Sequence, residues 1–257
     1  MIQTDNLSYK AGARYLVKDV SLDVQPGTLH LIIGANGAGK STLIKLMSGQ
    51  LQPSAGSVSY AGKTLAGYSF AQMACIRAVL SQSLEFSFPM KVDEVVMMGR
   101  YPHFTGSPKS KDLDACASAM DYFNVTDLAN RDYATLSGGE KQRVHFARVL
   151  AQIWYPTPNQ YRYLFLDEPL TFLDVHYQHQ FMQHVKDLLK MNDLVVLGVV
   201  HDLNLAAKFA DKITLLNEGQ VFATGNSTDV LTAKNLETIF HTTPDIISHK
   251  GTSYIFF

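Results

Sequence analysis

The chain has 257 residues, of which 46% are hydrophobic and 18% are charged, and its 22 Lys and Arg against 23 Asp and Glu give a net charge of −1. This composition is typical of a globular protein with a core and excludes an intrinsically disordered chain. The balanced charge excludes a protein that holds nucleic acid or anionic lipid by bulk electrostatics.

The sequence also argues against a membrane span and against secretion. The richest apolar run, 194–200, is much shorter than the roughly 20 residues that a spanning helix needs. The N-terminal residues carry neither a basic start nor an apolar stretch, so we expect no signal peptide. Cys75 and Cys116 are far apart and belong to no partner motif, which is typical of a reducing compartment. We expect a cytosolic protein.

Strand-like runs open the chain. Residues 20–24 alternate with period two, and residues 29–33 are a nearly continuous apolar run. A glycine-rich loop follows. From Lys40 the apolar residues are spaced three and four apart until Gly49 ends the pattern. Strand, loop and helix in this order predict the beginning of an α/β unit.

Helical spacing dominates the middle of the chain, over 112–123 and 140–154, and we interpret 86–154 as a helical insertion. The remaining elements alternate: strands are predicted at 77–80, 163–166, 194–200 and 212–216, helices at 175–191 and 203–210, and a hairpin return at 220–224. Two more short runs flank Lys250 and Gly251. Alternating strands and helices predict a mostly parallel sheet that is covered on both faces.

We therefore expect one domain over residues 1–257. Residues 1–85 and 155–257 would form its α/β core, and residues 86–154 would form a helical subdomain. We find no internal repeat and no low-complexity segment.

A phosphate-binding motif lies between the apolar run 29–33 and the helix that begins at Lys40. The pattern G-x-x-x-x-G-K-[ST] is met by Gly34, Ala35, Asn36, Gly37, Ala38, Gly39, Lys40, Ser41 and Thr42. Small residues let backbone N–H groups surround phosphates, and the helix N-terminus adds partial positive charge. Lys40 would reach the β- and γ-phosphates, and the Ser41 hydroxyl would hold Mg²⁺. A chance glycine turn in this context is rare, so the motif predicts ATP binding.

Two carboxylates follow the apolar run 163–166. Asp167 and Glu168 would lie at the carboxyl edge of the predicted sheet, where open α/β sheets bind ligands. Asp167 suits the Mg²⁺ shell, and Glu168 suits polarisation of an attacking water. Alone, these two residues are typical of an exposed turn. Together with the phosphate loop they predict a hydrolysis site.

A second glycine-rich helix start lies at Ser137, Gly138 and Gly139. Ser137 and Glu140 form the S-x-x-E pattern of a capping box, which is a purely structural interpretation. Two glycines are unfavourable in a simple cap, however. They leave the helix N-terminus bare, so we predict a second anion-binding site here.

The run 136–143 resembles the signature motif of ABC-type ATPases, and the resemblance extends over essentially the whole chain. Gln82 resembles the Q-loop glutamine, Asp174 the D-loop aspartate and His201 the switch histidine of this family. Each has an ordinary structural alternative: a loop polar residue, a helix cap and a strand-end histidine. The correct order of these motifs along the chain favours the functional interpretation.

The resemblance implies a P-loop NTPase fold. This fold has a RecA-like parallel sheet, an N-terminal antiparallel β subdomain and a helical insertion. It implies catalytic roles for Glu168, His201, Gln82 and Asp174, and a Mg²⁺ shell formed by Ser41, Gln82 and Asp167. It further implies a head-to-tail homodimer, in which Ser137, Gly138 and Gly139 of one copy cover the ATP held by the other.

Two positions depart from the family pattern. The family usually places an aromatic residue against adenine before the first strand pair, and Ala11 stands at the aligned position, between Tyr9 and Tyr15. We choose Tyr15 for stacking, with core packing as an open alternative. In the D-loop, Thr171 and Phe172 replace the usual small residues.

The segment 86–103 resembles ABC importers for haem, ferric siderophores and vitamin B12. Its ending 99–103, together with 147–154 and 201–207, is most similar to ATPases that energise haem import; another iron chelate or cobalamin is the alternative. The resemblance implies two integral-membrane permease partners, a periplasmic substrate-binding protein and a peripheral location on the cytoplasmic face of the inner membrane.

The rival functions are weaker. Soluble ABC ATPases that act on DNA or ribosomes usually carry long insertions or two ATPase units, and an exporter or a non-hydrolysing regulator fits the motifs less well. We therefore expect no nucleic-acid partner. The histidines His176, His179 and His184 lack carboxylate or cysteine partners in the sequence pattern, so we interpret them as solvated helix residues.

Overall fold

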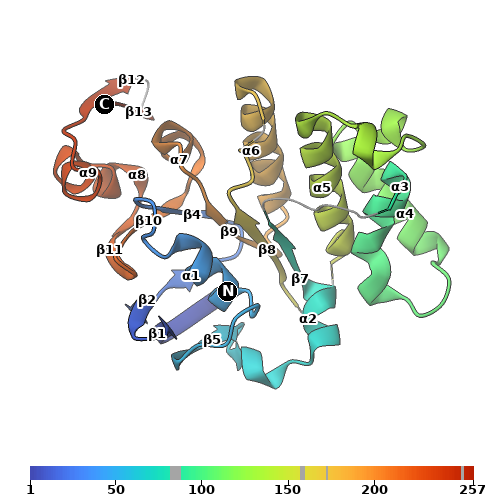
Figure 1. The fold of residues 1–257 in the computed structure, drawn as a ribbon, viewed down its shortest axis with the longest axis horizontal. Coiled ribbons are helices and arrows are strands. Elements are labelled where there is room, and N and C mark those ends of the chain that lie inside the picture. Colours follow the sequence, from blue (N-terminus) through green and yellow to red (C-terminus); the bar gives the residue numbers. More distant parts are fainter. Residues whose placement is uncertain (82–87, 157–159, 172, 250–251) are drawn as a thin grey trace.

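A six-stranded sheet lies at the centre of the computed structural model, which describes residues 1–81, 88–156, 160–171, 173–249 and 252–257 (Figure 1). Its strand order is β11-β10-β4-β9-β8-β7, and every neighbouring pair is parallel except β10 with β11. The strands are β4 (Leu29–Ile33), β7 (Arg77–Leu80), β8 (Arg162–Asp167), β9 (Leu194–Val199), β10 (Lys212–Asn217) and β11 (Gln220–Gly225). The predicted mostly parallel α/β sheet is confirmed.

Both faces of this sheet are buried, which explains the continuous apolar runs in the sequence. Along β8, Leu164 and Leu166 belong to one hydrophobic core, whereas Tyr163 and Phe165 belong to the other. Successive side chains of a strand point to opposite faces, so a sheet covered on both sides needs apolar residues at every position.

Helices cover the two faces unequally. α1 (Lys40–Met47) packs on one face together with the N-terminal strands, while α5 (Gly138–Gln152), α6 (Val175–Leu189) and α7 (Leu203–Phe209) supply apolar residues to the core on the other. Each of these helices begins and ends within two residues of its predicted bounds.

The N-terminal strands form a separate antiparallel sheet in the order β2-β1-β5-β6, with β3 also paired to β1. Its strands are β1 (Ile2–Ala11), β2 (Arg14–Val20), β3 (Asp23–Val24), β5 (Ala55–Tyr60) and β6 (Lys63–Thr64); η1 (Leu65–Gly67) and α2 (Phe70–Ile76) follow. The predicted single strand over 20–24 is instead divided. The Thr4 hydroxyl donates to the Val20 carbonyl at 3.0 Å and accepts from the Leu22 amide at 2.8 Å, so a side chain replaces the strand ladder at the bend.

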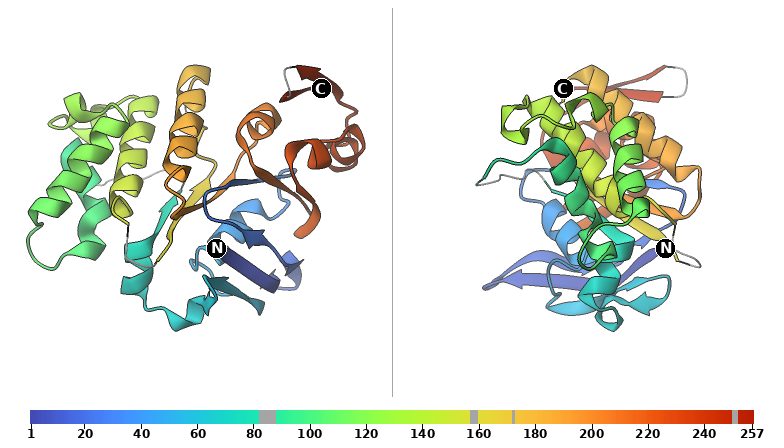
Figure 2. Two further views of the ribbon diagram at one scale, coloured as in Figure 1. Left: turned by 180° about the vertical axis from the view of Figure 1, so that it is seen from behind. Right: turned by 90° about the vertical axis from the view of Figure 1, so that its right-hand side faces the viewer.

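The segment between the two halves of the sheet is helical. It contains α3 (Val92–Met97), η2 (Met98–His103), α4 (Ser110–Tyr122), η3 (Thr126–Leu128), η4 (Tyr133–Thr135) and α5. Both figures show α3, α4 and α5 gathered at the side of the molecule away from the C-terminus (Figures 1 and 2).

A buried ion pair holds these helices together. The Arg100 guanidinium donates to Asp112 Oδ1 at 3.0 Å and to the Ala151 carbonyl at 2.8 Å, so one side chain links η2, α4 and the end of α5. Both charged side chains are at most 5% exposed.

The C-terminal part follows β11 with α8 (Ser227–Val230), α9 (Ala233–Phe240) and the hairpin of β12 (Asp245–His249) with β13 (Thr252–Phe256). The Asn204 side chain on α7 bonds both the amide and the carbonyl of Ile255, which attaches the hairpin to the main fold. In the described part of the chain, no helix combines the length and apolarity that crossing a membrane requires.

The Arg100–Asp112 pair yields a stability prediction. Asp112→Asn leaves the buried guanidinium without its counter-charge, so we expect the free energy of unfolding to fall by about 3 kcal/mol. Asp114→Asn on the same helix is the matched control, because Asp114 is exposed, and it should change stability by less than about 0.5 kcal/mol. Urea unfolding followed by circular dichroism measures both. Equal losses would show that the ion pair has no special role.

Candidate functional site

The loop between β4 and α1 has a backbone that only glycine fits at two points. Gly34 and Gly39 have φ of +152° and +97°. A Cβ atom at Gly34 would lie 2.3 Å from the Leu216 carbonyl oxygen, and one at Gly39 would lie 2.3 Å from that of Leu16. The loop is therefore packed backbone against backbone, with β10 on one side and β2 on the other, and this packing sets the shape that an anion would meet.

Lys40, the first residue of α1, folds back over this loop. Its ammonium donates to the carbonyls of Gly34 at 2.8 Å and Ala35 at 2.9 Å, and the residue is only 5% exposed. Burial lowers the pKa of Lys40, while the nearby carboxylates of Glu168 and Asp167 oppose that shift. The charge is held where phosphates would meet the helix N-terminus.

Ser41 and Asp167 meet at the carboxyl end of β8. The Ser41 hydroxyl donates to Asp167 Oδ1 at 2.9 Å. Burial raises the pKa of Asp167, and the Ser41 hydrogen bond partly offsets the shift. Two oxygen ligands at this distance, one of them a buried carboxylate, are suited to a Mg²⁺ ion that is also bound to phosphates.

Glu168 and His201 form the second pair at this edge. Glu168 has φ of +53°, and its amide donates to the Val199 carbonyl at 3.2 Å. Its Oε1 lies 2.7 Å from His201 Nε2, because parallel strands β8 and β9 end side by side. The positive φ of Glu168 is strained for a residue with a side chain, and such backbone strain often occurs at functional sites.

A pocket of about 500 Å³ lies over the phosphate loop. Its walls come from the loop itself, His201, the start of α7, the turn between β10 and β11, the end of α9 and one residue of the N-terminal hairpin. The lining residues are Gly34, Ala35, Asn36, Gly37, Ala38, His201, Leu203, Asn217, Glu218, Ile239, Phe240, His241 and Arg14. The pocket therefore joins the phosphate loop to the histidine of the Glu168 pair.

Ser137, Gly138 and Gly139 lie elsewhere. The Ser137 side chain accepts from the Glu140 amide at 3.3 Å, and the Glu140 carboxylate accepts from the Ser137 amide at 2.7 Å, which completes the predicted capping box. Ser137 and Gly138 are exposed, and a Cβ atom at Gly139 would meet no neighbour within 4 Å. α5 lies among the helices of the insertion, whereas α1 lies beside the N-terminal strands (Figure 1). Among the described residues, none of the signature run 136–143 lines the pocket over the phosphate loop.

The other predicted site residues have different surroundings. Asp174 caps α6, since its Oδ1 accepts from the Tyr177 amide at 3.0 Å. The Tyr15 ring lies 4.5 Å from the Lys10 ammonium and is not one of the residues that line the pocket. Gln82 and Phe172 fall outside the described residues.

Two residues that sequence reasoning missed contribute to this region. Arg14 lines the pocket. Gln142 is buried on α5 and donates to the Pro169 carbonyl at 2.6 Å, which links the signature helix to the segment after Glu168. The sequence feature that could have identified Gln142 is a polar residue one turn before Phe146, on the face of the helix that is otherwise apolar.

Comparison with known proteins agrees with this geometry. The family model described as ABC transporter matches residues 17–171. The chain belongs to the ABC transporter family. This cassette is 44% identical to the hemin import ATP-binding protein HmuV of Gloeobacter violaceus over 93% of its own length and 87% of that protein. It is 42% identical to the protein of that name from Escherichia coli O157:H7, over 93% and 92% of the two chains.

Solved structures resemble the cassette as well. A putative metal-chelate type ABC transporter in an inward-facing conformation matches with a TM-score of 0.83 at 28% identity, covering 99% of this chain and 96% of that one. A dimeric bacterial ABC transporter cassette matches with a TM-score of 0.75 at 25% identity, covering 88% and 99%. The expected P-loop NTPase fold is confirmed.

Lys40 gives the most direct test of the cassette's phosphate loop. Lys40→Ala removes a charge-assisted hydrogen-bond donor, so ATP affinity measured by calorimetry should fall about tenfold or more. Lys63→Ala, on an exposed position of β6, should leave that affinity within about twofold. A loss of the same size in both variants would mean that net charge, not the position of Lys40, controls binding.

Proposed function

We propose that this cassette is the ATP-hydrolysing subunit of a membrane importer for haem. The observation that carries the catalytic part is the 2.7 Å pair of Glu168 and His201 beside the phosphate loop. The cargo rests on similarity to hemin import ATP-binding proteins at 42–44% identity over most of the chain.

The residues around the pocket support a division of labour. The loop amides and Lys40 would hold the phosphates of ATP, with Lys40 near the β- and γ-phosphates. Ser41 and Asp167 would hold Mg²⁺, which neutralises charge on the phosphates, and the resemblance adds Gln82 to that shell. Glu168 would take a proton from the attacking water, and His201, bonded to Glu168, would fix its orientation and face the γ-phosphate.

Hydrolysis requires two copies in this proposal. The bare α5 start lies outside the pocket of its own chain, so Ser137, Gly138 and Gly139 would meet the phosphates bound by a second copy. A twofold axis then makes two equal sites. Asp174, at the start of α6, would lie at the interface between the copies. The dimeric ABC cassette of similar fold supports this arrangement.

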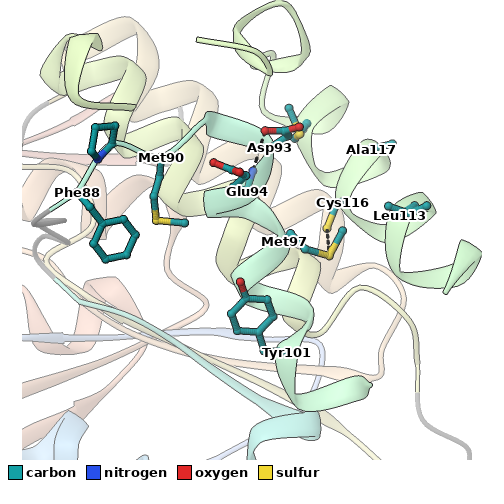
Figure 3. Close-up of a pocket in the computed structure, with 11 residues that line it drawn as sticks. Phe88, Met90, Asp93, Glu94, Met97, Tyr101, Leu113, Cys116 and Ala117 are labelled. Atoms are coloured by element: carbon teal, nitrogen blue, oxygen red, sulfur yellow. Dashed lines mark hydrogen bonds between the residues drawn. The ribbon is translucent and has the colours of Figure 1, made fainter. Parts of the chain in front are cut away.

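A groove on the helical insertion supports contact with a permease. Its volume is about 500 Å³, and it is lined by residues of α3, α4 and the segment before α3 (Figure 3). Met90 and Met97 provide flexible apolar surface, and Asp93 and Glu94 lie at the same wall. Cytoplasmic loops of membrane proteins carry an excess of Lys and Arg. A basic, partly apolar loop of a permease complements this groove.

We therefore place two cassettes on the cytoplasmic face of the inner membrane, each docked to one of two permease subunits through residues 86–154. A periplasmic binding protein would deliver the cargo from the other side. Closure of the cassette pair around ATP would bias the permeases between two conformations, since a ligand shifts an equilibrium by binding one state more tightly.

Glu168→Gln tests the catalytic role. The amide cannot accept the proton of the attacking water, so turnover should fall about a hundredfold or more while ATP is still bound. Phosphate release measures turnover, and size-exclusion chromatography with ATP should show a stable dimer. Retained hydrolysis would overturn the assignment of the base.

The double variant Glu168→Gln, Ser137→Arg is the control for the dimer. Ser137 is exposed at the start of α5, so arginine costs only its helix cap, about 1 kcal/mol, and blocks the contact with the second copy. This variant should bind ATP and remain monomeric. A dimer of unchanged abundance would refute the contact between Ser137 and the other copy.

Deletion of the gene tests the cargo. Without the cassette, cells should stop growing with haem as their iron source and should continue to grow with a ferric siderophore. The reverse pattern would assign the cassette to siderophore import, and a requirement for vitamin B12 supplements would assign it to cobalamin.

The same deletion strain tests the permease groove. The wild-type gene should restore growth on haem, and Asp93→Arg should not restore it. The isolated Asp93→Arg protein should keep its ATPase activity, which would assign the defect to the contact with the permease.

A further inference from the structure

The pocket over the phosphate loop has two ends, and only one of them is used by the hydrolytic residues. In the sheet, β4 lies between β9 and β10. His201 follows β9, so the γ-phosphate end of the pocket lies on that side of the loop. Asn217 and Glu218 follow β10 on the other side. A nucleoside triphosphate whose γ-phosphate faces His201 must place its base toward the β10–β11 turn.

Arg14 lies at this second end. The β10–β11 turn is fixed to β2, because the Lys18 amide donates to the Gly219 carbonyl at 2.8 Å. The Gly219 amide in turn donates to the Ala38 carbonyl of the phosphate loop at 3.0 Å. Leu16, two residues after Arg14, is in backbone contact with both Gly39 and Gly219. The position of Arg14 relative to the bound phosphates is therefore set by main-chain contacts.

The hairpin register leaves the Arg14 side chain open to the pocket. Ala11 is the cross-strand partner of Arg14 and presents only a methyl group on the same face. Tyr15 is the next residue along the strand and projects from the opposite face, where its ring lies 4.5 Å from the Lys10 ammonium. The Arg14 side chain makes no ion pair or hydrogen bond with any described residue, and the residue is exposed.

A free guanidinium in this position has one evident chemical use. The group is planar and delocalised, and it stacks on the face of a base without reading its edge. Its positive charge adds a cation–π attraction. A lysine at the same place would offer charge without a flat surface.

We propose that Arg14 is the stacking platform for the base of the bound nucleotide, in place of Tyr15. This inference rests on the proposed ATPase function, since it concerns the same pocket. It makes Arg14 a binding residue that contributes affinity through the base and not through the phosphates.

Calorimetry with two probes separates these contributions. ADP with Mg²⁺ carries the base, and inorganic tripolyphosphate with Mg²⁺ carries only phosphates. We expect Arg14→Ala to weaken ADP binding about tenfold, the size of one lost stacking contact, and to leave tripolyphosphate affinity unchanged. Tyr15→Ala is the matched control and should leave both affinities unchanged.

Replacement by a second flat group tests the stacking itself. Arg14→Tyr should restore most of the ADP affinity, whereas Arg14→Lys should not. Thermal unfolding of each variant checks that the hairpin is intact. Equal weakening of ADP and tripolyphosphate in Arg14→Ala would assign Arg14 to the phosphates and overturn the proposal. Loss of ADP affinity in Tyr15→Ala, or unchanged ADP affinity in Arg14→Ala, would overturn it as well.

Failure of the proposed ATPase function would give a different experimental result. If the cassette is not a nucleotide-binding protein, the wild-type chain will bind neither probe. If only the role of Arg14 is wrong, the wild-type chain will bind ADP and the pattern among the Arg14 variants will be absent.

Discussion

Close packing of the phosphate loop against two neighbouring backbones is the constraint on which the site depends. The Gly34 and Gly39 backbones approach carbonyl oxygens of Leu216 and Leu16 so closely that no side chain fits. Through these contacts the N-terminal antiparallel sheet, the central parallel sheet and the start of α1 hold one fixed relation. The loop can then bind a ligand without a free-energy cost for reorganising its backbone, because its shape is set before the ligand arrives.

The parallel sheet adds the reactive groups to this frame. β8 and β9 are neighbours, so their carboxyl ends bring Asp167 and Glu168 next to His201. β4 lies beside β9, which places the phosphate loop at the same edge. A parallel sheet collects side chains from distant parts of the sequence at one edge, and this is why residues more than a hundred positions apart, such as Ser41 and Asp167, form a hydrogen bond.

The sequence predicts the buried strands and helices well, but it does not predict where a strand bends or which exposed side chain faces the pocket. β4, β7 and the helices α5 to α7 were predictable because burial on both faces, or on one stripe, leaves a strong periodic pattern. The break in the strand over 20–24 was not, because it depends on the Thr4 side chain that bonds both sides of the bend. Arg14 was missed for a similar reason: only the register of Ala11 with Arg14 shows which side chain of the hairpin faces the pocket.

The separation of the two glycine-rich helix starts within one chain has a mechanical consequence. Gln142 links α5 to Pro169, which is next to Glu168. A displacement of the start of α5 would therefore reach the catalytic edge through a buried hydrogen bond. The Arg100 ion pair ties the same helix to the segment whose groove would receive the permease. A movement of α5 would therefore displace both the segment after Glu168 and the groove of the helical insertion. In the proposed transporter, a bundle held by such buried polar contacts would move as a unit, and its rigidity would carry a change at the nucleotide to the permease.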